Sequence, residues 1–323
     1  MFNGNELEIG RALRIANLHS KVFPKFKNMY YGRKIAVVGS GPSLNKYIPM
    51  KDVVHIGVNN AFKSHVELDF LFMADYARVK NFIAEASSYL PERCVKFYGL
   101  YDEDYNYNLY EHKLHIPEAL ACQANALRYY LNRVDLYPNE KFTGNIETKP
   151  LPVFGSVTFN AISFALYTNP KALYLVGLDT DSRGYYDGSK QDIILTTMND
   201  AIKNLRDGYR KLKDYALIHY PKTDIISINP VGLKGLFRDM YINNSGEHIY
   251  KDCDISENEW LTIPVAANRF ANLESSAPWT KDQFELLAGL IADRLRLRGA
   301  APRRRARRGG GRAPDHTNQR IYS

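Results

Sequence analysis

The chain has 323 residues, 45% hydrophobic and 12% aromatic, enough to bury one large core or a core with a small appendage. Its formal net charge of +8 comes from residues 294–323, which hold ten Arg and a single acidic residue. Without them the 43 basic and 35 acidic residues fall to 33 and 34. A neutral body argues against a nucleic-acid-binding surface, and the lack of about 18 consecutive apolar residues argues against a membrane-spanning helix.

The chain is expected to have four parts. Residues 101–150 are polar and aromatic without a steady period, which favours an insertion or lid, although a surface loop fits equally well. The Arg-rich end is expected to be disordered, and its abrupt change in composition favours an appended segment without a role in function. In chain order the parts are a helix and connector (1–30), an α/β domain (31–250) with the insertion (about 101–150), a helical extension (251–293) and the tail (294–323).

Strands and helices alternate along the body, which predicts a Rossmann-like, mostly parallel sheet with helices on both faces. An amphipathic helix is expected first, at residues 5–18, followed by a basic, aromatic connector with the sequence KVFPKFKNMYYG. Two further helices are expected at 156–169 and 202–216, the second from apolar residues that step by three and four. The strands are expected at 35–39, 53–60, 69–76, 95–100, 172–181 and 224–230.

A glycine-rich turn follows the first expected strand. It consists of residues 39–43 (Gly-Ser-Gly-Pro-Ser), called the 39–43 turn below. Backbone N–H groups between a buried strand and a helix suit an anionic phosphate, and glycine lets a ligand approach the backbone closely. The turn is neither a Gly-x-Gly-x-x-Gly fingerprint nor a Walker loop, and a tight turn without a ligand is the alternative.

Polar residues recur where the expected strands end. Asn59 and Asn60 follow the second strand, Asp75 the third, Asp179 the fifth and Asn229 the last. Ligands of parallel α/β sheets bind outside the carboxyl ends of the strands, and asparagine can read a base or a sugar through a donor and an acceptor. The pattern therefore predicts a nucleotide-type site at this edge, although each residue alone could cap a helix.

The catalytic groups are less clear from the pattern. Asp179-Thr180-Asp181 resembles the Asp-x-Asp of metal-dependent sugar transferases, in which carboxylates bind Mg²⁺ or Mn²⁺. His219 precedes the last expected strand, but an ordinary surface histidine is the more common explanation. Three widely spaced cysteines form no metal pattern and no even disulfide set, which favours a reducing cytoplasm.

The motifs VVGSGPSL and SVTFNAISFALYTNPKALYLVGLD, with the asparagine pair between them, resemble the bacterial sialyltransferases of glycosyltransferase family forty-two. They are equally similar to the MptE-like family, which includes pterin diphosphokinases and motility-associated glycosylation factors. The resemblance covers about residues 34–232. It implies a Rossmann-like fold with a nucleotide at the strand ends.

The resemblance also implies roles for individual residues. The donor nucleotide would contact a set that joins the glycine-rich turn, the strand ends and two tyrosines: Gly39, Ser40, Gly41, Pro42, Ser43, Asn59, Asn60, Asp75, Gly155, Ser156, Asp179, Tyr185 and Tyr186. The catalytic histidine of the sialyltransferases has no counterpart at 187–199. Either another group serves as the base, with His219, Asp187 and Asp192 as candidates, or the donor differs.

Three functions follow as expectations. The first is transfer of a sugar from a nucleotide-activated donor, such as a CMP-linked sialic acid, to a glycan acceptor in surface lipopolysaccharide or capsule. It needs no obligatory cofactor or metal. The second is MptE-like diphosphoryl transfer from ATP to a pterin alcohol, with Mg²⁺ held by Asp75, Asp179 and Asp181. The third is nucleotide binding without catalysis.

The expected partners follow from the first function. They are the nucleotide-sugar donor and the glycan acceptor, without nucleic acid. The expected location is the cytoplasm, with a place at the inner face of the membrane left open, as is the oligomeric state.

Overall fold

The computed structural model describes residues 4–74, 82–100, 125–132, 140–181, 184–189, 195–243 and 245–252. The chain divides into two compact units, Met1–Val265 and Ala266–Ser323, and every described residue belongs to the first. The Arg-rich tail lies outside the described residues, as does the expected helical extension apart from residues 251 and 252, which are not helical. Within the described ranges, no helix is both long and apolar enough to cross a membrane.

The described residues form one nine-stranded sheet with the order β5-β4-β3-β2-β1-β6-β7-β8-β9. Neighbouring strands are parallel except for β8 and β9, which pair antiparallel. The α/β fold predicted from the alternating elements is confirmed. The strands are β1 Lys34–Val38, β2 Val53–Val58, β3 Phe70–Met73, β4 Val95–Leu100, β5 Ala126–Tyr130, β6 Ala172–Val176, β7 Asp224–Ile228, β8 Arg238–Ile242 and β9 His248–Lys251.

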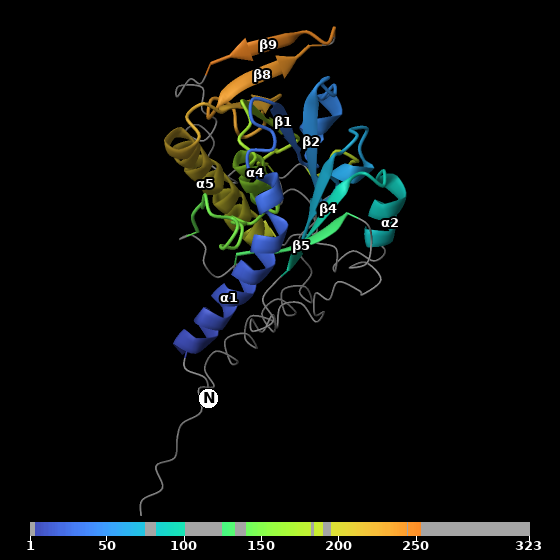
Figure 1. The fold of residues 1–323 in the computed structure, drawn as a ribbon. Helices are drawn as coiled ribbons and strands as arrows, with labels where there is room; N and C mark the ends of the chain where they lie inside the picture. The colour runs from blue at the N-terminus through green and yellow to red at the C-terminus, as the bar shows by residue number, and fades with distance from the viewer. Residues whose placement is uncertain are drawn as a thin grey trace, which may run out of the picture. The chain divides into compact units, whose positions relative to one another are not determined.

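Helices cover both faces of the sheet (Figure 1). On one face lie α1 Gly4–Val22, α4 Thr158–Tyr167 and α5 Leu195–His219, and on the other lies α2 Phe82–Tyr89. Three short 3₁₀ helices complete the set: η1 Pro24–Phe26, η2 Pro42–Lys46 and η3 Asn59–Lys63. The central strands are apolar on both sides because each face is covered.

Each face of the sheet has its own buried cluster. Ile35 and Val37 of β1 join the cluster under α1, α4 and α5, whereas Ala36 and Val38 join the one on the side of α2. This alternation is the two-residue period of a strand. The first cluster is rich in aromatic rings, with Phe72 and Phe97 stacked at a centroid distance of 4.4 Å.

Helix α4 lies in the middle of this layer. All ten of its residues are buried, which explains why its sequence is apolar all round rather than on one stripe. Its buried amide side chain, Asn160, accepts a hydrogen bond from the Tyr129 hydroxyl (2.9 Å) and donates one to the Pro152 carbonyl (2.6 Å). These bonds satisfy the polar atoms that burial removes from water.

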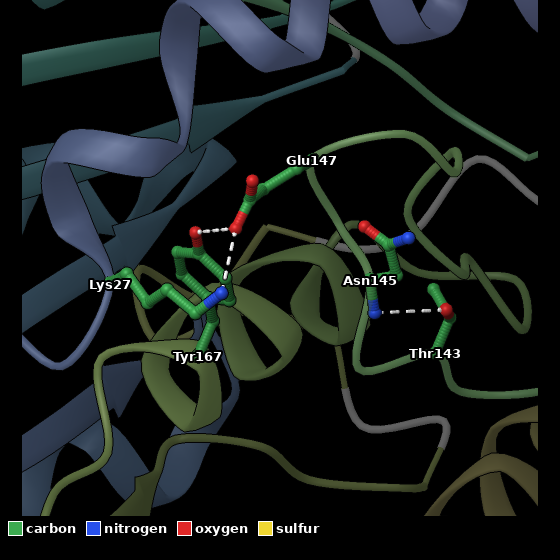
Figure 2. A network of polar contacts seen from close by, with 5 residues as sticks. All are labelled: Lys27, Thr143, Asn145, Glu147 and Tyr167. Atoms are coloured by element: carbon green, nitrogen blue, oxygen red, sulfur yellow. Dashed lines mark hydrogen bonds and ion pairs between the residues drawn. The ribbon is translucent and has the colours of Figure 1, made fainter.

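The segment before α4 is held to the helix layer by a polar network (Figure 2). Glu147 accepts hydrogen bonds from the Tyr167 hydroxyl (2.7 Å) and from Lys27 Nζ (3.1 Å). The bond from Tyr167, followed by that from Lys27, lowers the pKa of Glu147 below its usual value. Nearby, the backbone N–H of Asn145 donates to the Thr143 hydroxyl at 3.2 Å.

Candidate functional site

The order of the strands places a topological switch point between β1 and β6. From β1 the chain proceeds to β2 on one side, and from β6 it proceeds to β7 on the other side. Ligands of open α/β sheets bind outside the carboxyl ends of the strands at such a point. The 39–43 turn follows β1 here, and residues 177–181 (the 177–181 turn) follow β6.

The two turns interlock through their backbones. The Gly39 N–H donates to the Val176 carbonyl and the Gly41 N–H to the Gly177 carbonyl, each at 2.8 Å. A Cβ at position 39 would lie 2.4 Å from Leu178 Cδ2. Glycine is therefore required at position 39 by the neighbouring turn, whereas the sequence analysis attributed it to the approach of a ligand.

An acidic side chain from the 177–181 turn binds the 39–43 turn. Asp179 Oδ2 accepts the Ser43 N–H at 2.8 Å, and Asp179 Oδ1 accepts the Ser43 hydroxyl at 2.5 Å. A Cβ at position 41 would lie 2.7 Å from Asp179 Cγ. Gly41 itself has φ −68°, which lies outside the left-handed region that favours glycine. The Asp179 carboxylate thus binds the N–H that was expected to hold a phosphate.

Two of the asparagines at strand ends hold neighbouring strands together. Asn59 and Asn229 follow β2 and β7 with φ of +42° and +46°, a conformation that asparagine tolerates better than most residues. Asn59 Oδ1 accepts the N–H of Ala74, directly after β3, and Asn229 Oδ1 accepts the N–H of Ile242 in β8, each at 3.1 Å. Both side chains therefore have the same structural task on opposite halves of the sheet.

Three other predicted residues come together beside the switch point: Ser40, Asn60 and Tyr186, called the Ser40–Asn60–Tyr186 cluster below. The Tyr186 N–H donates to the Ser40 carbonyl at 2.8 Å, and its hydroxyl donates to the Asn60 carbonyl at 3.5 Å. Asn45, which the sequence analysis missed, donates from Nδ2 to the Tyr186 carbonyl at 2.8 Å. Elements far apart in the sequence thus meet at one place.

The cluster keeps a polar atom without a partner among the described residues. Within the described part of the chain, the buried Oδ1 of Asn60 has no hydrogen-bond partner. Burial, followed by the nearby Asp187, raises the pKa of Tyr186. The hydroxyl of Tyr186 therefore remains a proton donor at neutral pH. Unsatisfied buried groups are uncommon, and a bound ligand is one of the usual reasons for them.

The three proposed catalytic residues have different positions. Asp187 lies next to the cluster, where bonds from the Ser189 hydroxyl and N–H lower its pKa. His219 ends α5 at the opposite edge of the sheet, just before β7, with its ring centroid 4.5 Å from that of Tyr215. The structure does not bring His219 to the switch point. Asp192 lies outside the described residues, as does Asp75 of the nucleotide-binding set.

The other predicted residues lie in different segments of the structure. Gly155 and Ser156 lead into α4, where Gly155 has φ +85° and Ser156 Oγ accepts the Thr158 N–H at 3.2 Å. Tyr185 is part of a tight loop in which its N–H donates to the Ser189 carbonyl. Pro42 begins η2, a position where its missing N–H costs nothing.

Glu140 shapes the entry to α4 and was not predicted. Its buried carboxylate accepts the N–H groups of Val153 and Phe154, each at 2.6 Å. Burial is the largest influence on this group and raises its pKa, while the two backbone bonds act in the opposite direction. No sequence pattern points to this contact, because Glu140 lies 13 and 14 residues before its partners and outside any regular element.

The carboxylates expected to bind Mg²⁺ do not form a metal site in the described part of the chain. Asp179 is engaged by Ser43 through both oxygens, and Asp181 follows it in the same turn. Among the residues that the structure describes, no group of three or more His, Cys, Asp or Glu side chains is arranged to hold a metal ion.

Neither a protein-family model nor a curated protein matches the sequence. Solved structures with weak similarity include the MAf glycosyltransferase from Magnetospirillum magneticum AMB-1, with 17% identity and a TM-score of 0.36. That match covers 66% of this chain but 36% of the glycosyltransferase, so the chain spans about a third of that protein.

The sialyltransferase CstII from Campylobacter jejuni is similar in two structures. In complex with CMP-3FNeuAc it has 12% identity and a TM-score of 0.33, and the match covers 60% of this chain and 79% of CstII. In complex with cytidine-5'-monophosphate CstII has 13% identity and a TM-score of 0.34, and the match covers 61% of this chain and 80% of CstII. Similarities of this strength assign no function to this chain.

Proposed function

We propose that the chain binds a nucleotide-activated sugar at the Ser40–Asn60–Tyr186 cluster and transfers the sugar to an acceptor hydroxyl. The observation that carries this proposal is the buried, unpartnered Oδ1 of Asn60, which lies with the backbone of Ser40 and the hydroxyl of Tyr186 at a switch point. The Ser40 N–H and the Tyr186 hydroxyl suit a phosphate, and the amide oxygen suits an N–H donor of a base.

The chemistry would proceed by attack of the acceptor oxygen on the anomeric carbon. The bond from that carbon to the donor phosphate breaks, and its electron pair leaves with the phosphate oxygen. Hydrogen bonds from Ser40 and Tyr186 would stabilise this charge, and a general base would take the acceptor proton. Asp187 lies close to the cluster, but its lowered pKa makes it a weak base and better suited to orienting the acceptor.

In its more specific form, the proposal is that the donor is a CMP-linked acidic sugar such as sialic acid. It rests on the motifs that resemble the bacterial sialyltransferases. The diphosphokinase alternative would require Asp179 as a ligand of Mg²⁺, although Ser43 already binds both of its carboxylate oxygens. This engagement favours the nucleotide-sugar function.

The proposal is tested by measuring thermal stabilisation of the full chain with CMP, UDP, GDP and ATP, with and without Mg²⁺. We expect CMP to raise the melting temperature, since a ligand at 100 times its dissociation constant adds about 2.7 kcal/mol. Tyr186→Phe and Asn60→Ala should weaken the effect. Tyr31→Phe, which changes an exposed tyrosine before β1, is the matched control.

Several outcomes would contradict this function. If no nucleotide stabilises the chain, or if Tyr186→Phe and Tyr31→Phe behave alike, the cluster is not the binding site. Stabilisation by ATP with Mg²⁺ alone would support diphosphoryl transfer. Binding of CMP without turnover of any CMP-sugar would support a non-catalytic role.

A further inference from the structure

The amino edge of the sheet, opposite the candidate site, carries a basic and apolar surface that the proposed function does not use. It is formed by residues 24–34, 169–171 and 217–222, called the amino-edge surface below. These segments contain six Lys or Arg and no Asp or Glu. Four of the six basic residues belong to the first segment, 24–34, which leads into β1.

The three segments form one continuous surface because backbone hydrogen bonds join them. The Tyr30 N–H donates to the Thr168 carbonyl at 3.1 Å, and the Lys171 N–H donates to the Arg33 carbonyl at 2.9 Å. The Asp224 N–H, just after the third segment, donates to the Lys171 carbonyl at 2.9 Å. The side chains of the segments therefore emerge from neighbouring stretches of backbone.

Large apolar side chains are exposed on this surface. Met29 is 54% exposed, Tyr31 69%, Leu217 73% and Ile218 72%. Single exposed apolar residues are ordinary, but four that gather on segments joined by hydrogen bonds indicate an interaction surface. Leu217 and Ile218 are adjacent in the last turn of α5, so that both project from the body of the domain.

The amino-edge surface has no acidic residues of its own to neutralise its positive charge. Lys25, Arg33, Lys171 and Lys222 are exposed, and none of them is in an ion pair with another residue of the described ranges. Two acidic groups at its border are already paired. Glu147 binds Lys27 at 3.1 Å, and Asp224 binds Arg238 at 3.0 Å.

We propose that the amino-edge surface binds the anionic face of a lipid bilayer. Exposed Lys and Arg are attracted by anionic headgroups, while Met, Leu, Ile and Tyr side chains enter the boundary between headgroups and acyl chains. A nucleic acid would satisfy the charges but offers no apolar phase for Leu217 and Ile218. The candidate site lies at the opposite edge of the sheet, so membrane and nucleotide can be bound together.

The experiment measures sedimentation of the full chain with vesicles of phosphatidylcholine alone and of equal parts phosphatidylcholine and phosphatidylglycerol. Arg33→Glu with Lys171→Glu reverses two charges on the surface. Lys141→Glu with Lys203→Glu reverses two exposed charges elsewhere and is the matched control. We expect the first pair to lower partition into the anionic vesicles at least about tenfold more than the control pair. Thermal melts verify that each variant is folded.

A second measurement reports the position of the surface directly, independently of the Arg-rich tail. Tyr31→Trp adds an indole on the surface, and Tyr89→Trp adds one at an exposed tyrosine of α2. With brominated anionic vesicles, we expect the emission that the indole at position 31 adds over wild type to be quenched and that added at position 89 to remain. Leu217→Ser with Ile218→Ser should weaken vesicle binding as well.

The proposal fails if the wild-type chain does not bind anionic vesicles, if both charge-reversed pairs lose binding equally, or if the indole at position 31 is not quenched. Binding of duplex DNA that depends on Arg33 and Lys171 but not on Leu217 and Ile218 would assign the surface to nucleic acid instead. None of these outcomes depends on nucleotide binding, so the proposed function can fail or stand separately.

Discussion

At the scale of single residues, Gly41 shows how closely the two turns are fitted. A Cβ at this position would lie 2.7 Å from Asp179 Oδ2, which holds the Ser43 N–H. We predict that Gly41→Ala displaces Asp179 and lowers the free energy of unfolding by about 1–3 kcal/mol. Urea denaturation measures this change. Gly10→Ala, inside α1 and 3.7 Å from a flexible Arg14 atom, should leave stability unchanged or raise it. Equal effects of both substitutions would contradict the prediction.

The bond between Ser43 and Asp179 can be measured on its own. We predict that Ser43→Ala and Asp179→Asn each lower stability, and that a double-mutant cycle gives a coupling of about 1–3 kcal/mol, as expected for hydrogen bonds to a charged group. The measurement is denaturant unfolding of the two single variants and the double variant. Additive effects would mean that the carboxylate does not depend on Ser43 in solution.

At the scale of elements, Asn59 joins the ends of β2 and β3. Asn59→Gly tolerates the left-handed backbone and removes only the bond to the Ala74 N–H. Asn59→Ala removes the same bond and also strains the left-handed backbone. We predict a loss of about 1–3 kcal/mol for the glycine variant and about 1–2 kcal/mol more for the alanine variant. Thermal unfolding gives both values, with Asn17→Ala on the exposed side of α1 as the control. Equal losses for glycine and alanine would show that backbone strain is not involved.

The central elements could be predicted from the sequence, and the edges of the sheet could not. β1, β2 and β6 are buried on both faces, so each reads as a mostly apolar run, with His55 in β2 as a buried exception. β5 has a single buried residue, Tyr129, and all of β9 is exposed, so neither strand shows a pattern. β5 therefore lies inside the segment that was predicted to be an insertion.

The prediction of the candidate site had a similar limit. The strand-end pattern predicted a site at the carboxyl edge of the sheet, and the structure brings Ser40, Asn60 and Tyr186 together at that edge. The pattern could not separate Asn59, which binds the backbone of Ala74, from Asn60, whose Oδ1 has no partner among the described residues, because the two look alike in a sequence. The distinction arises from the left-handed backbone of Asn59, which turns its amide toward Ala74.

His19 couples α1 to two other elements and should make stability depend on pH. Its Nδ1 lies 2.9 Å from the Ile146 carbonyl, and its Nε2 accepts the Tyr130 N–H at 2.7 Å, so the folded state needs the neutral ring. Burial lowers the pKa of His19 from 6.5 to about 4, although backbone hydrogen bonds at Ile146 and Lys149 act to raise this pKa. The unfolded chain therefore binds more protons than the folded one between these two values.

We predict that the stabilising effect of a neutral His19 is complete above pH 6.5 and is lost as the pH falls toward 4. The free energy of unfolding should be lower by about 3 kcal/mol at the acidic end of this interval. The measurement compares urea unfolding of wild type and His19→Gln across this interval. His19→Gln should have the flatter profile, and His248→Gln, at an exposed position, should follow wild type. Parallel profiles for wild type and His19→Gln would contradict the prediction.

At the scale of the whole molecule, all described members of both buried clusters belong to the first unit. Their members extend from Val22 to Met240 and include residues from each face of the sheet. The two interlocked turns lie between these clusters at the switch point, so the candidate site depends on the packing of both. The charge of the chain has a different origin, because residues 294–323 supply ten of its 43 basic residues.

This separation of charge from core gives a last prediction. Deletion of residues 294–323 removes ten Arg and one acidic residue and leaves 33 basic and 34 acidic residues, but it removes none of the members of the two clusters. We predict that the truncated chain keeps its melting temperature and its affinity for CMP, because the deleted segment has charge without an apolar pattern. Binding to anionic vesicles should decrease without being abolished, since the amino-edge surface remains. Calorimetry and vesicle sedimentation test the two parts separately. A large loss of folded protein on deletion would show that the tail packs against the body, and complete loss of vesicle binding would assign that binding to the tail.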